Sequence, residues 1–214
     1  SENKNLLRIT KALAGIPCTL VIVGELSDNQ RSSLQNNNIN FVNHIGIDRE
    51  QLVKLYQQSD IVMFASLYEG FGLPILEANA IGRAVITSNI YSMPDVAGNS
   101  ACYVNPYQVK EINVAVKQLI NDSVYRALLI ENGFQNVIVI LDNRNELKRL
   151  LKFAGNYKIK IGLRMAVKEE PQSAYKTSRF GIQPTELIRF YNETIHHLEQ
   201  VELSMLHFFV DSGI

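Results

Sequence analysis

The sequence predicts an α/β fold built on a doubly wound parallel sheet. Short apolar runs alternate with helical patterns along the 214 residues, and turns rich in Gly, Asn and Pro separate them. The run Cys18–Gly24 is continuously apolar and ends in glycine, which is typical of a strand buried on both faces of such a sheet. Ligands of doubly wound sheets bind outside the carboxyl ends of the strands, so we expect a site after one or more of these runs.

The first series of elements extends to about residue 137. We expect its strands at Cys18–Gly24, Asn40–Val42, Ile61–Ser66, Ala84–Thr87 and Ala101–Val104. The expected helices are Leu6–Leu13, Asn29–Asn36, Asp48–Gln58, Pro74–Ile81, Lys110–Asn121 and Ser123–Asn136. Asp48 is placed to cap its helix, because a carboxylate before the first turn accepts hydrogen bonds from free backbone N–H groups.

A second series follows without a flexible linker. It comprises a strand at Val137–Leu141, a helix at Arg144–Phe153 capped by Asp142 or Asn143, an alternating stretch at Tyr157–Ala166, a polar loop at Val167–Arg179, a helix from about Thr185 to Val201 and a strand at Leu203–Val210. The two series form either one continuous sheet or two subdomains. A three-stranded piece leaves an open edge, so we expect it to dock onto the first sheet or to self-associate.

Composition excludes several classes of protein. The 21 basic and 21 acidic side chains cancel, so the chain lacks the positive field of a nucleic-acid-binding protein. Cys18 and Cys102 lie in apolar stretches and are expected to be buried thiols in a reducing cytoplasm, not a disulfide or zinc pair. No apolar run reaches the roughly 18 residues of a membrane span, and the N-terminus lacks signal-peptide character. We also expect no metal site, since His196 and His197 are adjacent on a helix and point about 100° apart.

The segment Ser66–Glu77 carries the richest chemistry. Gly70 and Gly72 allow a tight turn after a strand, and Pro74 suits the first position of a helix. The backbone N–H groups before that helix therefore form a ready anion site. Glu69 and Glu77 flank it, and two carboxylates beside a phosphate cradle suit recognition of sugar and ribose hydroxyls. An ordinary strand-to-helix loop also contains these residue types, so that alternative stays open.

The complete string is more specific than its parts. Glu69-Gly70-Phe71-Gly72-Leu73-Pro74-Ile75-Leu76-Glu77 resembles, without a gap, the motif of the C-terminal, donor-binding domain of retaining GT-B glycosyltransferases of group 1. The resemblance covers about residues 1–137 and includes the runs Leu20–Gly24, Leu55–Val62, Glu77–Ile86 and Pro94–Gly98. It implies a Rossmann-like GT-B half that binds a nucleotide-diphosphate sugar.

The resemblance also implies a role for each motif residue. Glu69 would act at the donor sugar as the catalytic carboxylate, Glu77 would hold the ribose hydroxyls, and Lys4 would neutralise the diphosphate. The sugar hydroxyls and phosphates would meet the backbone amides of Gly70, Phe71, Gly72 and Leu73. The base would lie against Val42–Ile45. Such enzymes need no metal or other cofactor, because a cation and helix-end amides stabilise the departing diphosphate.

Some parts of the family pattern lie outside this sequence. Family members carry a strand and a Gly-Arg pair just before the Lys4 segment, and an N-terminal domain that binds the acceptor. We therefore expect the chain to bind a donor but to be incomplete and inactive alone. The identity of the sugar, nucleotide and acceptor cannot be read from the sequence.

Residues 138–214 resemble something else. Lys160–Arg164, Ser178–Ile182 and Leu206–Gly213 are similar to parts of the barrel of pyridoxal-phosphate-dependent arginine and diaminopimelate decarboxylases. This implies a partial (β/α) barrel-like segment, with Phe209 in place of the histidine that stacks on the cofactor and Ser212 as the serine near it. No lysine here lies in the Schiff-base motif, so we do not expect pyridoxal phosphate to be held covalently.

Three functional hypotheses follow from these resemblances. The first is a glycosyltransferase donor-binding domain at residues 1–137 with a nonstandard extension at residues 138–214. The second is a non-catalytic hybrid, whether a natural fusion, a misjoined sequence or an engineered chimera of α/β fragments. The third, ranked last because its lysine is missing, is a fragment of a decarboxylase.

Overall fold

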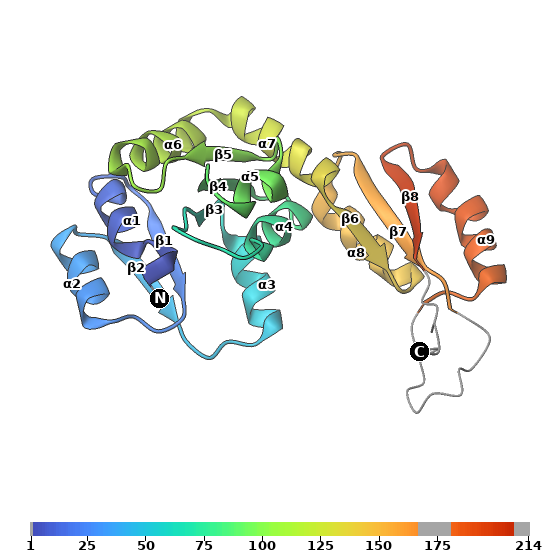
Figure 1. The fold of residues 1–214 in the computed structure, drawn as a ribbon. Coiled ribbons are helices and arrows are strands. Elements are labelled where there is room, and N and C mark those ends of the chain that lie inside the picture. The colour runs from blue at the N-terminus through green and yellow to red at the C-terminus, as the bar shows by residue number, and fades with distance from the viewer. Residues whose placement is uncertain (1, 167–180, 208–214) are drawn as a thin grey trace. The chain divides into compact units, whose positions relative to one another are not determined.

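A computed structural model describes residues 2–166 and 181–207 (Figure 1). The chain divides into two compact units, Ser1–Asn136 and Val137–Ile214. Each unit has its own strands and helices, and both alternate strand with helix along the chain.

The first unit contains parallel strands only, among the residues described. In chain order its elements are a 3₁₀ turn (Glu2–Lys4), α1 (Leu6–Leu13), β1 (Thr19–Val23), α2 (Asp28–Asn36), β2 (Asn40–His44), α3 (Arg49–Gln58), β3 (Ile61–Phe64), α4 (Leu73–Ala80), β4 (Ala84–Ser88), α5 (Ser92–Ala97), β5 (Ala101–Val104), α6 (Val109–Asn121) and α7 (Ser123–Asn136). β1 pairs with β2, and β4 lies between β3 and β5. The predicted α/β parallel-sheet fold is confirmed for this unit.

Two apolar clusters hold this unit together. One joins α1, α6 and α7 to the strands, and Leu20 of β1 and Met63 of β3 both pack against its buried residues. The other lies between β3, β4, α4 and α5 and includes Phe64, Ile75 and Met93. The first cluster links β1 to β3 through side chains, although the described backbone groups of these two strands are not hydrogen-bonded to each other.

The expectation that Cys18–Gly24 is buried on both faces is wrong. Leu20 packs into the core, but Val21 and Val23 are 40% and 49% exposed. A strand is buried on both faces only when other elements cover both faces, and the described residues cover only the Leu20 side of β1. An apolar run therefore predicted the strand but not its surroundings.

Local signals set most of the boundaries. The side chain of Asp48 accepts a hydrogen bond from the backbone N–H of Gln51 at 2.8 Å, which confirms the predicted cap of α3. Pro74 is the second residue of α4, not the first, because the helix begins at Leu73. Helix α5 was not predicted, since its six residues are too few to show a helical period.

The second unit is a smaller parallel sheet with its helices. Its elements are β6 (Ile138–Leu141), α8 (Arg144–Ala154), β7 (Ile159–Arg164), α9 (Pro184–Glu193), a 3₁₀ turn (Ile195–His197) and β8 (Val201–His207). The strand order is β6-β7-β8, and both pairings are parallel. The described strands form an open sheet rather than a closed one, so the expected barrel-like segment is not shown. Asn143, and not Asp142, caps α8.

The predicted helix Thr185–Val201 is too long. Helix α9 ends at Glu193, Thr194 leaves the helical conformation with φ of −131°, and β8 begins at Val201. The apolar stripe is nevertheless buried at Leu187, Phe190 and Ile195. Ile195 lies in a separate 3₁₀ turn but still packs in line with the apolar residues of α9. Hydrophobic periodicity alone therefore predicted a helix that continued past Glu193.

Membrane-spanning helices and metal clusters are both absent from the described ranges. None of the helices there combines the length and apolar character needed to cross a membrane. Nor do these ranges contain a group of three or more His, Cys, Asp or Glu side chains placed to hold a metal ion. His196 and His197 are exposed neighbours whose ring centroids lie 5.6 Å apart.

Candidate functional site

The loop between β3 and α4 changes direction at Gly72. This residue precedes the first turn of α4 with φ of 101°, a conformation that side chains rarely adopt. A Cβ atom there would also lie 3.3 Å from Cδ1 of Ile75. The positive φ therefore favours glycine at this position, and an added methyl group would require the Ile75 side chain to shift.

The amide groups of this loop are available to a ligand. The backbone N–H groups of Gly70, Phe71, Gly72 and Leu73 donate to no acceptor among the described residues. The side chains of Phe71 and Leu73 are 55% and 59% exposed, so the loop lies at the surface. Because helix α4 begins here, its dipole adds partial positive charge to these amides, which favours an anion.

The N-terminal segment is fastened to the same loop. Asn5 is 3% exposed, and its backbone adopts a left-handed conformation with φ of 58°. Its side-chain amide donates hydrogen bonds to the carbonyl oxygens of Ala65 at 3.0 Å and Pro106 at 2.7 Å. The backbone N–H of Leu67 donates to the carbonyl of Asn3 at 2.8 Å. These bonds fix the 3₁₀ turn Glu2–Lys4 beside the carboxyl end of β3.

As a result, Lys4 reaches Glu69. The Nζ atom of Lys4 lies 2.7 Å from Oε1 of Glu69 and 4.8 Å from the centre of the Phe64 ring. The Glu69 side chain is 18% exposed, whereas that of Lys4 is 53% exposed. Lys4 can therefore neutralise Glu69 and still present its charge to solvent or to an anion.

Hydroxyl groups hold the backbone near Glu69. Ser92 Oγ donates to the carbonyl of Glu69 at 3.1 Å, and Ser88 Oγ donates to the carbonyl of Ser66 at 2.6 Å. Ser66 and Ser88 are both buried. Hydrogen bonds from α5, from β4 and with the N-terminal segment thus hold the backbone of this loop in place.

Glu77 lies on the exposed surface of α4 and has a partner that the sequence did not reveal. The hydroxyl of Tyr56 on α3 donates to Oε2 of Glu77 at 2.8 Å. Burial, together with the hydrogen bond to Glu77 and its charge, raises the pKa of Tyr56, so the tyrosine stays a hydrogen-bond donor. Nothing in the local pattern of α3 marks Tyr56, because its role depends on a residue of another helix.

Lys4, Glu69 and the four loop amides lie at the carboxyl end of β3, and Glu77 follows on α4. Val42 in the middle of β2 and Ile45 just after this strand are 46% and 54% exposed. Phe209 and Ser212 lie outside the described residues.

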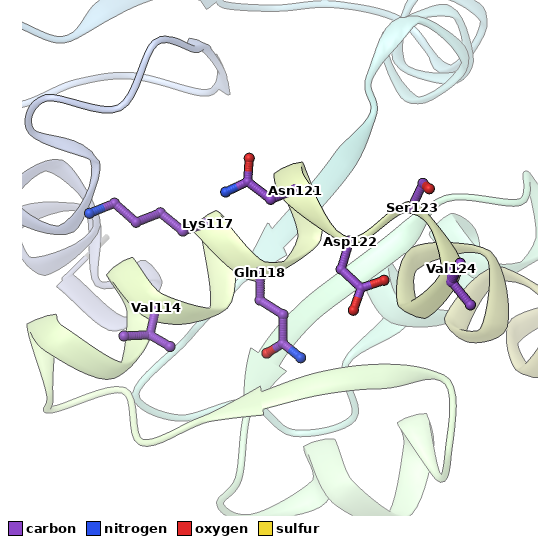
Figure 2. A pocket seen from close by; sticks show the side chains of 7 residues that line it. All are labelled: Val114, Lys117, Gln118, Asn121, Asp122, Ser123 and Val124. Carbon is purple, nitrogen blue, oxygen red and sulfur yellow. The ribbon is translucent and has the colours of Figure 1, made fainter.

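A shallow hollow elsewhere in this unit has none of the motif residues. It lies where α6 meets α7 and is lined by Val114, Lys117, Gln118, Asn121, Asp122, Ser123 and Val124 (Figure 2). Figure 2 shows Lys117 and Gln118 pointing in different directions from α6. Asp122 accepts a hydrogen bond from the backbone N–H of Tyr125, so its carboxylate caps α7. The side chains of Lys117, Gln118 and Asn121 in Figure 2 therefore do not point toward one common centre.

Known proteins share the sequence of the first unit. The family described as "Glycosyl transferases group 1" matches residues 1–136. The O-antigen chain mannosyltransferase B of Escherichia coli is 34% identical over 94 residues, which are 44% of this chain and 25% of that protein. The serotype-specific mannosyltransferase WbdA of Escherichia coli is 42% identical over 80 residues, 37% of this chain and 10% of that protein. The chain thus spans a quarter or less of the length of these two relatives.

Solved structures share its fold. The C-terminal domain of a glycosyl transferase group 1 family protein from Francisella tularensis matches with a TM-score of 0.55 and 28% identity, over 64% of this chain and 79% of that one. WaaG, a glycosyltransferase involved in lipopolysaccharide biosynthesis, matches with a TM-score of 0.57 and 20% identity, over 72% and 44% of the two chains.

The family match ends where the first unit ends, at Asn136. The expected likeness of residues 138–214 to a decarboxylase barrel gains no support from these comparisons, and neither does a chimera. On its residues 1–136, the chain belongs to the group 1 glycosyl transferases.

Proposed function

We propose that residues 1–136 bind a nucleotide-diphosphate sugar and serve as the donor half of a retaining glycosyltransferase. Glu69 contacts the sugar as the catalytic carboxylate, and Glu77 binds the ribose hydroxyls. Lys4 and the amides of Gly70–Leu73 receive the diphosphate. The reaction transfers a hexosyl group, and no metal or other cofactor is needed for the charge on the leaving group.

One observation carries this proposal. The ungapped segment Glu69–Glu77 stands in a group 1 domain, and the fold brings Lys4 to 2.7 Å from Glu69 beside four amides that have no acceptor in the described structure. A cation and oriented amides stabilise a departing diphosphate in advance of the reaction. Mannose is the first sugar to test, since the two relatives above are named mannosyltransferases.

Nuclear magnetic resonance titration tests donor binding directly. UDP, GDP, ADP and CDP are titrated separately into the labelled chain, and we expect one of them to shift the amide signals of Gly70–Leu73. Glu77→Ala should reduce the shifts at equal nucleotide concentration, while Glu131→Ala, which removes an exposed carboxylate from α7, should leave them intact. Unperturbed amides at millimolar concentrations of all four nucleotides would contradict the proposal.

The chain alone is proposed to bind the donor without transferring the sugar to an acceptor. The acceptor contacts of the family belong to its N-terminal domain. Incubation with the sugar nucleotide and a candidate acceptor should therefore release no glycoside product, and product formation by this chain would refute this part of the proposal.

A further inference from the structure

The Glu77 carboxylate is held by a tyrosine from a neighbouring helix. Glu77 is exposed on α4, where a free side chain would exchange among several rotamers. The Tyr56 hydroxyl lies 2.8 Å from its Oε2 atom, and hydrogen bonds to ionised acceptors are stronger than neutral ones. This contact restricts the carboxylate before any ligand arrives.

Tyr56 itself has a fixed position. It packs partly buried against the cluster that contains Phe64, Ile75 and Met93. Its backbone carbonyl accepts a hydrogen bond from Nε of Arg83 at 3.1 Å, and the next carbonyl, of Gln57, accepts one from the same guanidinium. Arg83 thereby ties the carboxyl end of α3 to the turn that follows α4. The tyrosine hydroxyl is presented by a rigid frame rather than by a mobile loop.

The bond leaves Glu77 able to bind a diol. A carboxylate has about four acceptor positions, and Tyr56 uses one of them. In the described part of the chain, Oε1 of Glu77 has no hydrogen-bond donor. Two vicinal hydroxyl groups can therefore be accepted by a carboxylate whose orientation is already set, so less rotamer entropy is lost on binding.

We propose that Tyr56 is a positioning residue that orients Glu77 for the ribose diol and thereby increases the preference of the site for ribonucleotides. This inference rests on the proposed function, since it assumes that Glu77 binds ribose. A purely structural role for the hydroxyl of Tyr56 differs in its consequences: it would affect folding and all ligands alike, whether or not they carry the diol.

The test compares Tyr56→Phe with the unaltered chain. Affinities are measured by calorimetry for the tightest-binding of UDP, GDP, ADP and CDP, and for its 2′,3′-dideoxy counterpart. We expect Tyr56→Phe to weaken the ribonucleotide about fivefold and to leave the dideoxynucleotide unchanged. Adding Tyr56→Phe to Glu77→Gln should have no further effect, because the oriented carboxylate is already lost.

Tyr103→Phe is the matched control. It removes a tyrosine hydroxyl that donates to the carbonyl of Gly98 at 2.6 Å, outside the site, and should leave both affinities unchanged. A second measurement needs no ligand: the side-chain carboxyl ¹³C signal of Glu77 should move in Tyr56→Phe and stay in place in Tyr103→Phe.

The outcomes separate the two proposals. Equal affinity of Tyr56→Phe and the unaltered chain for the ribonucleotide, equal losses for both nucleotides, or an unmoved Glu77 signal would overturn the role of Tyr56 alone. If the unaltered chain binds none of the four nucleoside diphosphates, the proposed function fails, and the role of Tyr56 falls with it.

Discussion

Lys4 and Glu69 form an ion pair of 2.7 Å across 65 positions of sequence. The pair lies beside the loop amides that have no acceptor in the described structure. It joins Lys4, which is proposed to bind the diphosphate, to Glu69, which is proposed to act at the sugar. In the proposed reaction, the diphosphate competes with Glu69 for the ammonium group. We propose that binding of the donor weakens this ion pair and leaves the Glu69 carboxylate free to contact the sugar.

Replacing Lys4 by alanine should weaken donor binding with little effect on folding. An exposed ion pair contributes about 0.2–1 kcal/mol to stability, whereas a charged hydrogen bond to phosphate contributes about 1.5–3 kcal/mol, or tenfold or more in affinity. Calorimetry should show a larger loss for a nucleoside diphosphate than for the monophosphate. Lys11→Ala, on the exposed side of α1, is the control. Equal losses for the two nucleotides would argue against contact between Lys4 and the diphosphate.

Gly72→Ala should destabilise the protein and disturb the loop. The positive φ costs an alanine about 1–2 kcal/mol, and the new Cβ would be crowded by Ile75. Gly15→Ala separates these effects, since Gly15 also has a positive φ (76°) but a methyl group added there would meet no described atom within 4 Å. Urea unfolding should show a larger loss for Gly72→Ala than for Gly15→Ala. Equal losses would show that crowding at the loop is negligible.

Stability should fall at alkaline pH. Burial raises the pKa of the Cys102 thiol above its usual value of 9.0, despite an opposing hydrogen bond with Tyr125, and burial and Glu77 raise that of Tyr56 above 10.0. Between the unfolded and folded pKa values the native state binds more protons, so the free energy of unfolding decreases as pH rises from about 9. Urea titrations from pH 7 to about 11 measure this slope. Cys102→Ala and Tyr56→Phe should each make it shallower, and a slope unchanged in both variants would contradict the assignment.

The second unit is proposed to self-associate through an open sheet edge. In the described structure β6 and β8 each pair with one strand only, β7. Unpaired strand edges offer backbone groups to other chains. Size-exclusion chromatography at two concentrations should show earlier elution at the higher one. Ser204→Pro, which removes a backbone donor from β8, should reduce this change if β8 is the edge used. Elution independent of concentration would refute the proposal.

Much of the fold follows from local sequence. The bounds of α1, β5 and α7 agree with the predicted ones, and Asp48 caps α3 as expected, because helix periods and cap residues act within a few positions of one another. The end of α9 was misjudged, since Ile195 continues the apolar stripe after the helix has stopped. The exposure of Val21 and Val23 was also missed, because burial depends on what covers a strand and not on the strand itself.

By itself, the sequence determined the motif from Glu69 to Glu77, its family and the turn that Gly72 makes before α4. Only the tertiary structure decided which groups meet that motif: Lys4 at Glu69, and Tyr56 at Glu77. The physical reason is that each contact joins separate elements and is not set by neighbours along the chain. The packing of β3, α3 and α4 around their shared core places Tyr56 at Glu77, and the hydrogen bonds of Asn5 and Leu67 place Lys4 at Glu69.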